Sequence, residues 1–370
     1  MIYLDNNATT AVDPRVFEAM KPFFLSDYGN ASSIHALGRS ARTALEEARA
    51  HVARLVGVRS GEIIFTSGGT ESDNLALRGA AWQRRGQGRH IITSRTEHPA
   101  VLEACRQLQE EGFSVTFLPV DSSGLVDIEA LDQDLQEYGD DTILVSIMYA
   151  NNETGTLQPI EDIARKAHEH GAWVHSDAVQ AMGKIAVKAP QLGVDLLSLT
   201  GHKFHGPKGC GALYVRSGLK LKPQMVGGSH EKGFRPGTEN VSGAVGLGEA
   251  CRLAELELDE RQSRMSDLRD QLEEGVLASI ADVAVNGSRE ERLPQTANLS
   301  FLGVEGESLL MALDLEGVAV STGAACAAGS HSGSHVLREM RLDKSVLQGA
   351  IRFSLGSETT REEIDQVLEL

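Results

Sequence analysis

Several short stretches of this sequence place polar or reactive side chains directly after an apolar run. In the first of them, Phe65-Thr66 is followed by Ser67-Gly68-Gly69-Thr70 and then by a helical pattern. The backbone N–H groups at the start of a helix, together with the Thr70 hydroxyl, can bind an anion. The stretch lacks the Gly-Lys-Ser/Thr ending of a nucleotide P-loop, so it favours a monophosphate over a triphosphate. A simple turn in which Thr70 caps the helix is the alternative interpretation.

The second stretch ends in a carboxylate. Asp177 follows the apolar segment 172–176, and Gln180 comes three residues later. Ligands of open α/β sheets bind at the carboxyl ends of the strands. A carboxylate in that place can keep a proton on a heteroaromatic nitrogen, although Asp177 could instead cap a helix.

The third stretch contains a lysine. Lys203 lies in Thr200-Gly201-His202-Lys203-Phe204-His205-Gly206, just beyond another apolar run. A desolvated lysine amine loses its proton readily and can form a Schiff base, and Thr200 and His202 could add phosphate contacts. A solvated loop is the weaker alternative. A phosphate cup, a carboxylate for a ring nitrogen and a Schiff-base lysine are together the features that bind pyridoxal phosphate.

The four cysteines differ in their surroundings. Cys326 lies in segment 321–334, which is rich in Gly, Ala and Ser, whereas Cys105, Cys210 and Cys251 do not. We therefore predict an exposed loop with a nucleophilic thiol at Cys326, and three structural thiols elsewhere. A metal site formed by Cys326 with His331 or His335 is disfavoured because structural zinc takes four ligands, so we expect no metal.

Arg352 alternates with apolar residues in Ile351-Arg352-Phe353-Ser354-Leu355. A guanidinium in such a strand could bind a substrate carboxylate through two parallel hydrogen bonds. A structural ion pair is the alternative interpretation.

Composition narrows the class of protein. The 370 residues carry 35 Lys and Arg against 52 Asp and Glu, a formal charge of −17, which disfavours nucleic acid and anionic membranes as partners. No apolar run reaches the roughly 20 residues that span a bilayer, and the first residues lack the pattern of a signal peptide. We therefore expect a cytoplasmic protein. The scattered cysteines indicate neither disulfides nor a C-x-x-C metal site.

Alternating elements must position these side chains. Short apolar strands alternate with amphipathic helices up to about residue 215, which predicts an α/β fold with a mostly parallel sheet covered on both faces. A long charged helix is expected from Val245 to Ile280, leading into a smaller α/β unit. The strands expected in that unit lie near 298–301, 318–321 and 351–355.

Many ordered motifs closely resemble one family, the cysteine desulfurases of the class V aminotransferase group, of the NifS/IscS type and the long-loop subgroup. The matching segments cover the chain almost from end to end: Tyr3–Thr10, Gly29–His35, Gly68–Asn74, Thr96–Ala100, Asn151–Gly155, His175–Gln180, Gly201–Gly209, Arg235–Asn240, the Cys326 segment and Arg352. The resemblance implies a fold-type I transferase dependent on pyridoxal 5'-phosphate. Its large cofactor-binding domain would span 13–250, and its small domain would comprise 1–12 and 251–370 with the cysteine loop.

The resemblance also implies roles for individual residues. Lys203 would hold the cofactor as a Schiff base, Cys326 would be the nucleophile and His98 would assist proton transfers. The cofactor would contact Gly69, Thr70, His98, Asp177, Gln180, Thr200, His202 and Lys203, with Thr238 from the partner of a homodimer. Asn152 and Arg352 would bind the substrate carboxylate.

The implied reaction removes sulfur from L-cysteine, giving L-alanine and a persulfide on Cys326. The persulfide would pass to an acceptor protein such as an iron–sulfur scaffold. A selenocysteine lyase, or another β-eliminating lyase that does not need Cys326, is the alternative within the enzyme class. A non-catalytic sulfur-relay protein is the alternative outside it.

Overall fold

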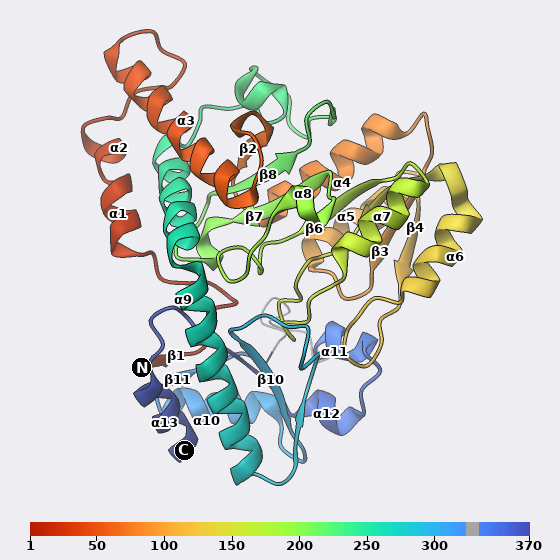
Figure 1. Cartoon of the computed structure of the whole chain (residues 1–370), viewed down its shortest axis with the longest axis vertical. Coiled ribbons are helices and arrows are strands. Elements are labelled where there is room, and N and C mark those ends of the chain that lie inside the picture. Colours follow the sequence, from red (N-terminus) through yellow and green to blue (C-terminus); the bar gives the residue numbers. More distant parts are fainter. Residues whose placement is uncertain (323–332) are drawn as a thin grey trace.

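The structure, a computed structural model, describes residues 1–322 and 333–370. Its centre is a seven-stranded sheet (Figure 1). In spatial order the strands are β2 (Ile63–Thr66), β8 (Gly211–Val215), β7 (Leu196–Thr200), β6 (Trp173–Asp177), β5 (Thr142–Ser146), β3 (His90–Ser94) and β4 (Ser114–Leu118). β8 runs antiparallel to both neighbours and the other pairs are parallel, which confirms the mostly parallel sheet.

Helices cover both faces of this sheet, as the continuous apolar strands require. On one face lie α4 (Gly69–Arg84) and α5 (Pro99–Glu110), whose apolar residues form one core with β2, β3 and β5. On the other face lie α3 (Ala36–Val56), α6 (Ile128–Tyr138), α7 (Ile160–Glu169) and the first part of α9. The sheet edge at the carboxyl ends of β6 and β7 thus lies between two packed helical layers.

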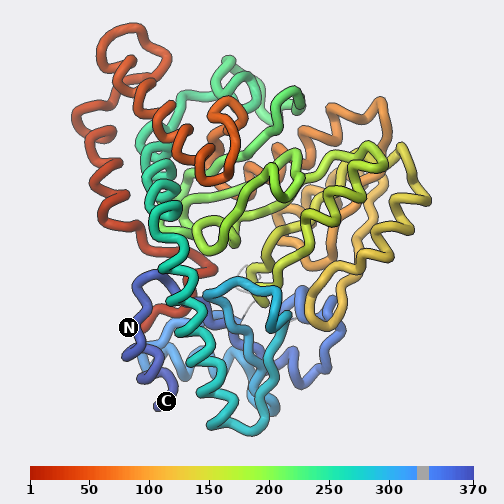
Figure 2. The backbone as a smooth tube through the Cα atoms, viewed as in Figure 1, coloured from red at the N-terminus to blue at the C-terminus, as the bar shows by residue number. Residues whose placement is uncertain are grey.

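A second, smaller unit lies at the other end of the molecule (Figure 1). It contains the antiparallel sheet β12-β10-β9 and the parallel pair β1-β11. Their bounds are β1 (Ile2–Tyr3), β9 (Val283–Val285), β10 (Thr296–Phe301), β11 (Val318–Ala319) and β12 (Ala350–Ser354). The first residues of the chain therefore pack against its last third, and both termini lie at this end (Figure 2).

The long charged helix is confirmed as α9 (Val241–Ser279), and it joins the two units. Ala250, Cys251 and Ala254 pack in the core of the large sheet, whereas Leu268 and Leu272 pack in the core of the small unit. The expected domain limits at residues 12 and 250 stay a prediction.

The remaining helices are short. They are α1 (Pro14–Met20), α2 (Pro22–Leu25), α8 (Ala189–Leu192), α10 (Gly306–Leu315), α11 (His335–Glu339), α12 (Lys344–Gln348) and α13 (Arg361–Glu369). The two-residue β1 and the three-residue β9 were not predicted, because such short strands carry no periodic pattern. Within 1–322 and 333–370, no helix has the length and apolar character needed to cross a membrane.

Candidate active site

Lys203 lies directly beyond the carboxyl end of β7, in the helical turn Gly201–Lys203. Its Nζ donates hydrogen bonds to the backbone oxygens of Asn7, at 2.6 Å, and Ala8, at 2.8 Å. The N-terminal segment therefore lies against this lysine, although almost 200 residues separate them in the sequence. These contacts partly shield the Lys203 amine from solvent, which disfavours the alternative of a solvated loop.

Asp177 is the last residue of β6, the strand parallel to β7. The register pairs Asp177 with Ser198, so Thr200 and Lys203 follow at the same edge of the sheet. The Asp177 Oδ1 accepts a hydrogen bond from the Val179 amide at 2.8 Å, which closes a turn; no helix begins within the described residues 178–185, so the alternative of a helix cap is wrong. Burial raises the pKa of Asp177 to about 6, and the nearby Lys203 opposes that rise. The structure thus brings Asp177 and Lys203 together, as the sequence suggested.

A buried polar layer lies behind Asp177, and the sequence did not reveal it. The His175 ring is hydrogen-bonded on both sides, to the Ser146 hydroxyl at 2.9 Å and the Ser198 hydroxyl at 3.0 Å. Burial lowers the pKa of His175 to about 3, so this ring is neutral. Asp73 lies 3.6 Å from the ring, and its pKa is raised by burial and by the charge of Asp177. Asp73 lies in the Gly68–Asn74 motif, which was the available signal.

The start of α4 forms the expected cup. Its N-cap residue is Gly68, which has no side chain, and Thr70 is the second residue of the helix, so the alternative cap by Thr70 is wrong. The Glu71 carboxylate accepts a hydrogen bond from the Ser67 amide, at 2.7 Å, just before this helix. A Cβ on Gly69 would lie 2.9 Å from Val179 Cγ2, so only glycine lets this turn pack on the turn after β6. Thr70 is exposed, within the first turn. The exposed N–H groups there can bind an anion.

Two further residues that could contact a phosphate, Thr200 and His202, lie at the carboxyl end of β7. The Thr200 hydroxyl donates to the Cys210 backbone oxygen at 3.2 Å, and it lies 3.7 Å from where a Cβ on Gly68 would be. Thr200 therefore borders the cup. His202 Nδ1 lies 3.2 Å from the Thr9 hydroxyl, and burial lowers the pKa of this ring to about 4.

His98 is the N-cap residue of α5. Its Nδ1 accepts a hydrogen bond from the Ala100 amide at 3.1 Å, so a neutral ring carries its proton on Nε2. Burial, and then the positive charge of Lys203, lowers the pKa of His98 to about 4. His98 is therefore a neutral imidazole near Lys203 at neutral pH.

Gln180 joins a network that the sequence did not predict. Its Nε2 donates to the Asn7 backbone oxygen at 3.0 Å, and its Oε1 accepts from Lys184 Nζ at 3.3 Å. Lys184 is buried, with 5% of its surface exposed. The signal for it was a lone lysine in the apolar segment 181–185.

Asn152 and Arg352 meet at the boundary of the two units. Arg352 Nη1 donates to the Asn152 backbone oxygen at 2.9 Å, and Nη2 pairs with the Asp5 carboxylate at 2.6 Å. The alternative of a structural ion pair is therefore correct for one edge of this guanidinium. Its Nε is buried and has no hydrogen-bond partner in the part of the chain that the structure describes.

Cys326 lies outside the described residues, but both ends of its segment are held beside the site. Ser321 exchanges two backbone hydrogen bonds with Arg352. The Ser334 hydroxyl donates to the carboxylate of Glu153, the residue after Asn152, and burial raises the pKa of Glu153 to about 7. A segment between these two anchors starts and ends next to Arg352 and Asn152.

Thr238 is exposed, on the loop before α9. Arg235, in the same loop, pairs at 2.9 Å with Glu71, which follows Thr70. Within one chain, this ion pair therefore holds the loop that carries Thr238 beside the start of α4.

The other cysteines are buried thiols. Cys105, Cys210 and Cys251 are unpaired, and burial raises the pKa of all three, that of Cys210 to about 12. This confirms their structural character. Outside residues 323–332, no three His, Cys, Asp or Glu side chains gather in a way that could hold a metal ion.

The donor set fits pyridoxal phosphate. A buried carboxylate with a raised pKa suits a positively charged ring nitrogen, and an uncapped helix start suits a phosphate. The cradle between them is lined by Gly69, where a side chain would clash. Burial raises the pKa of Asp177 and lowers that of His98, the charge of Lys203 lowers both, and this lysine completes the set.

Known proteins resemble this chain in sequence over its whole length. The sequence profile of the family described as "Aminotransferase class-V" matches residues 2–367. A protein of Dictyoglomus turgidum named "Cysteine desulfurase IscS" is 51% identical over 369 residues, covering 100% of this chain and 93% of that protein. A "Cysteine desulfurase" of Nostoc sp. is 49% identical, with 100% and 92% covered.

Solved structures of other proteins have a backbone fold similar to that of this chain. A structure titled "NIFS-LIKE PROTEIN" superposes with a TM-score of 0.93 at 42% identity, covering 100% of this chain and 97% of that one. One titled "SspA in complex with cysteine" superposes with a TM-score of 0.85 at 34% identity, covering 97% of this chain and 100% of that one.

Proposed function

The chain belongs to the class-V aminotransferase family and is a cysteine desulfurase, and from that premise we propose the role of each site residue. The family implies pyridoxal phosphate as cofactor. One observation carries the proposal: Lys203, Asp177 and the uncapped start of α4 meet at one edge of the central sheet.

The cofactor is held by residues from both sides of that edge. Lys203 would bind it covalently, Asp177 would pair with its ring nitrogen and Gln180 with its phenolic oxygen. Gly69, Thr70, Thr200 and His202 would hold the phosphate, and His98 would pack on the ring. When bound, the cofactor supplies an electron sink that weakens the bonds to the α-carbon of an amino acid.

The protons of the reaction are moved by Lys203 and His98. The Lys203 amine would take the α-proton of the substrate, because it lies at the same edge of the sheet as Asp177 and an amine is a suitable general base. His98 stays a neutral imidazole with its proton on Nε2, since its pKa is lowered to about 4, so it would donate a hydrogen bond from Nε2 and could give up a proton only after taking up another. Asp177 keeps its charge to hold the proton on the ring nitrogen.

Asn152 and Arg352 bind the carboxylate of L-cysteine. The Arg352 Nε, buried and without a partner within 1–322 and 333–370, is the donor available for it. Asp5 and the Asn152 backbone oxygen hold the guanidinium in place. A fixed guanidinium discriminates carboxylate geometry better than a mobile one.

Cys326 accepts the sulfur. Its thiolate attacks the sulfur of L-cysteine, a new S–S bond forms and the C–S bond breaks, so that L-cysteine and the Cys326 thiol become L-alanine and a Cys326 persulfide. A free thiol has a pKa of about 8.5, so its proton must be removed first. The β-carbon that loses the sulfur keeps the electron pair of the C–S bond and takes up one proton to become the methyl group of L-alanine, so the protons balance. The anchoring of Ser321 and Ser334 beside the site supports this assignment.

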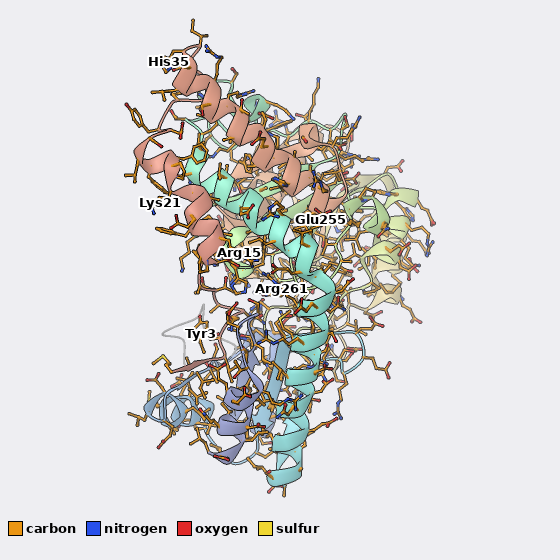
Figure 3. All side chains as sticks on the ribbon, turned by 60° about the vertical axis from the view of Figure 1, so that its left-hand side comes forward. Tyr3, Arg15, Lys21, His35, Glu255 and Arg261 are labelled. Carbon is orange, nitrogen blue, oxygen red and sulfur yellow. The ribbon has the colours of Figure 1, made fainter. Side chains whose placement is uncertain are left out.

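We extend the proposal to a homodimer and to a protein acceptor such as an iron–sulfur scaffold. Large apolar side chains are exposed on α1, α2 and the segment before α3, the elements marked by Arg15, Lys21 and His35 in Figure 3. They are Phe17, Phe24, Leu25, Tyr28 and Ile34. Such a patch suits a partner subunit, whose site would receive Thr238. The cytoplasmic location stays a prediction.

The test is mass spectrometry of the purified protein after incubation with L-cysteine. We expect one or more added sulfur atoms on Cys326 and the cofactor on Lys203. Cys326→Ala should lose persulfide formation and keep the cofactor absorbance, whereas the control Cys251→Ala should keep both.

Two results would contradict the proposal. Undiminished sulfur release by Cys326→Ala would indicate a lyase that does not need this thiol. A protein that stays colourless after addition of pyridoxal phosphate would indicate a non-catalytic relay.

A further inference from the structure

Lys184 is a buried cation for which the proposed function has no role. It follows Gly183 in the turn after β6, and 5% of its surface is exposed. Its Nζ contacts two neutral amide oxygens, Gln180 Oε1 at 3.3 Å and Asn7 Oδ1 at 3.5 Å. Both contacts are long for a charged donor.

Other buried cations of this chain have carboxylate partners. Arg49 forms a two-bond pair with Glu231, and Arg292 lies 2.6 Å from Glu273. A buried ammonium without a counter-ion is costly, and it is retained where it does something that a neutral side chain cannot. Burial, and then the charges of Lys203 and Arg352, lowers the pKa of Lys184 to about 7.

The backbone brings the two lysines together. Gly183 has φ +72°, and a Cβ on it would lie 2.8 Å from the Cβ of Phe204, the residue after Lys203. Only glycine allows this approach. The turn that carries Lys184 is therefore packed against the turn that carries Lys203.

The two amines also share one residue. Lys203 Nζ donates to the Asn7 backbone oxygen at 2.6 Å, and Lys184 Nζ reaches the Asn7 side-chain oxygen. Gln180 donates to the same Asn7 backbone oxygen through Nε2, while its Oε1 faces Lys184. Because Lys184 can only donate, it fixes which way the Gln180 amide points.

We propose that Lys184 is a positioning residue that orients the Gln180 amide toward the cofactor and places a second cation beside Lys203, so that the Lys203 nitrogen gives up its proton more readily. This inference rests on the proposed function, since it concerns the same cofactor site. Gln180 Nε2 has two hydrogens. One is held by Asn7, and the other can face the phenolic oxygen.

The electrostatic balance around Lys203 includes other groups. Asp177 favours the protonated amine, whereas Lys184 disfavours it. His98 and His202 also face Lys203, and both rings have pKa values lowered to about 4, so they are neutral near pH 7. Arg352 is the further cation near Lys184. Below about pH 7, where Lys184 carries its charge, removing that charge therefore leaves Asp177 less opposed.

The test is a pH titration of the holoenzyme, followed by the visible absorbance of the bound cofactor, without substrate. We expect the midpoint of Lys184→Met to rise by about one pH unit, within the range for loss of a neighbouring charge. Lys184→Gln, which keeps a polar N–H donor but no charge, should rise similarly. Lys184→Arg should return the midpoint close to the wild-type value, and Lys220→Met, a change at an exposed lysine, should leave it unchanged.

An unchanged or lowered midpoint in both neutral variants would overturn the inference. Failure of both to fold, judged by circular dichroism, would assign Lys184 a structural role and would also overturn it. A wild-type protein with no cofactor absorbance would instead contradict the proposed function, so the two failures are distinguishable.

Discussion

The buried position of Asp177 suits the cofactor, but it lowers the stability of the cofactor-free protein. We predict that Asp177→Asn stabilises the cofactor-free protein at pH 8 and abolishes desulfurase activity. The variant keeps an oxygen that can accept the hydrogen bond from the Val179 amide. It removes a negative charge that burial disfavours.

The magnitude follows from the pKa. A carboxyl whose pKa rises from 3.8 to about 6 on folding destabilises the folded protein above pH 6 by about 3 kcal/mol, at about 1.36 kcal/mol per pH unit. Because the folded-state pKa is raised, the cost is absent below pH 3.8 and grows as the pH rises to 6. The gain from Asp177→Asn should therefore be largest at pH 7 to 8 and should shrink toward pH 4.

The assay is urea unfolding of the cofactor-free protein at pH 8 and pH 4.5, with the free energy extrapolated to water. Asp195→Asn is the matched control, because Asp195 is also buried but contacts Arg216 at 2.7 Å and His168 at 3.0 Å. Weakening those pairs should destabilise by about 1 kcal/mol, because Arg216 and His168 are partly exposed. The two buried carboxylates should thus respond with opposite signs.

Equal or lower stability of Asp177→Asn at pH 8 would refute the reasoning. It would mean that Asp177 is already compensated without the cofactor. A gain of the same size at both pH values would also refute it, because a packing effect does not follow the titration of a carboxyl group.

Two other substitutions test the site and its support. Arg352→Lys should raise the KM for L-cysteine at least about tenfold and leave the cofactor absorbance unchanged, since an ammonium cannot hold Asp5 and Asn152 and present a third donor in the guanidinium plane; an unchanged KM would place the substrate carboxylate elsewhere. Glu231→Gln should lower the free energy of unfolding by about 3 kcal/mol, because the buried Arg49 guanidinium then keeps only the partly exposed Glu46 carboxylate, at 3.2 Å, as a counter-ion; urea unfolding measures this, and a loss below about 1 kcal/mol would contradict it.

The sequence by itself determined the local features. The strand, glycine and helix order at 63–84 predicted the cup, and the apolar runs before Asp177 and Lys203 placed both at strand ends. These features depend on neighbouring residues, so they can be read from spacing and turn chemistry. The alternation of strands and helices predicted the parallel sheet, and the helical pattern predicted α9 within a few residues.

Only the tertiary structure decided which distant residues meet. Asn7 contacts Gln180, Lys184 and Lys203, and Asp5 pairs with Arg352 across 347 positions of the chain. A periodic pattern shows which face of an element is apolar, but it does not show which polar group lies opposite a buried one. The cost of burying Asp177 or Lys184, and therefore its pKa, depends on those partners. The reactive side chains could be identified from the sequence, whereas their pKa values depend on how the two units pack around them.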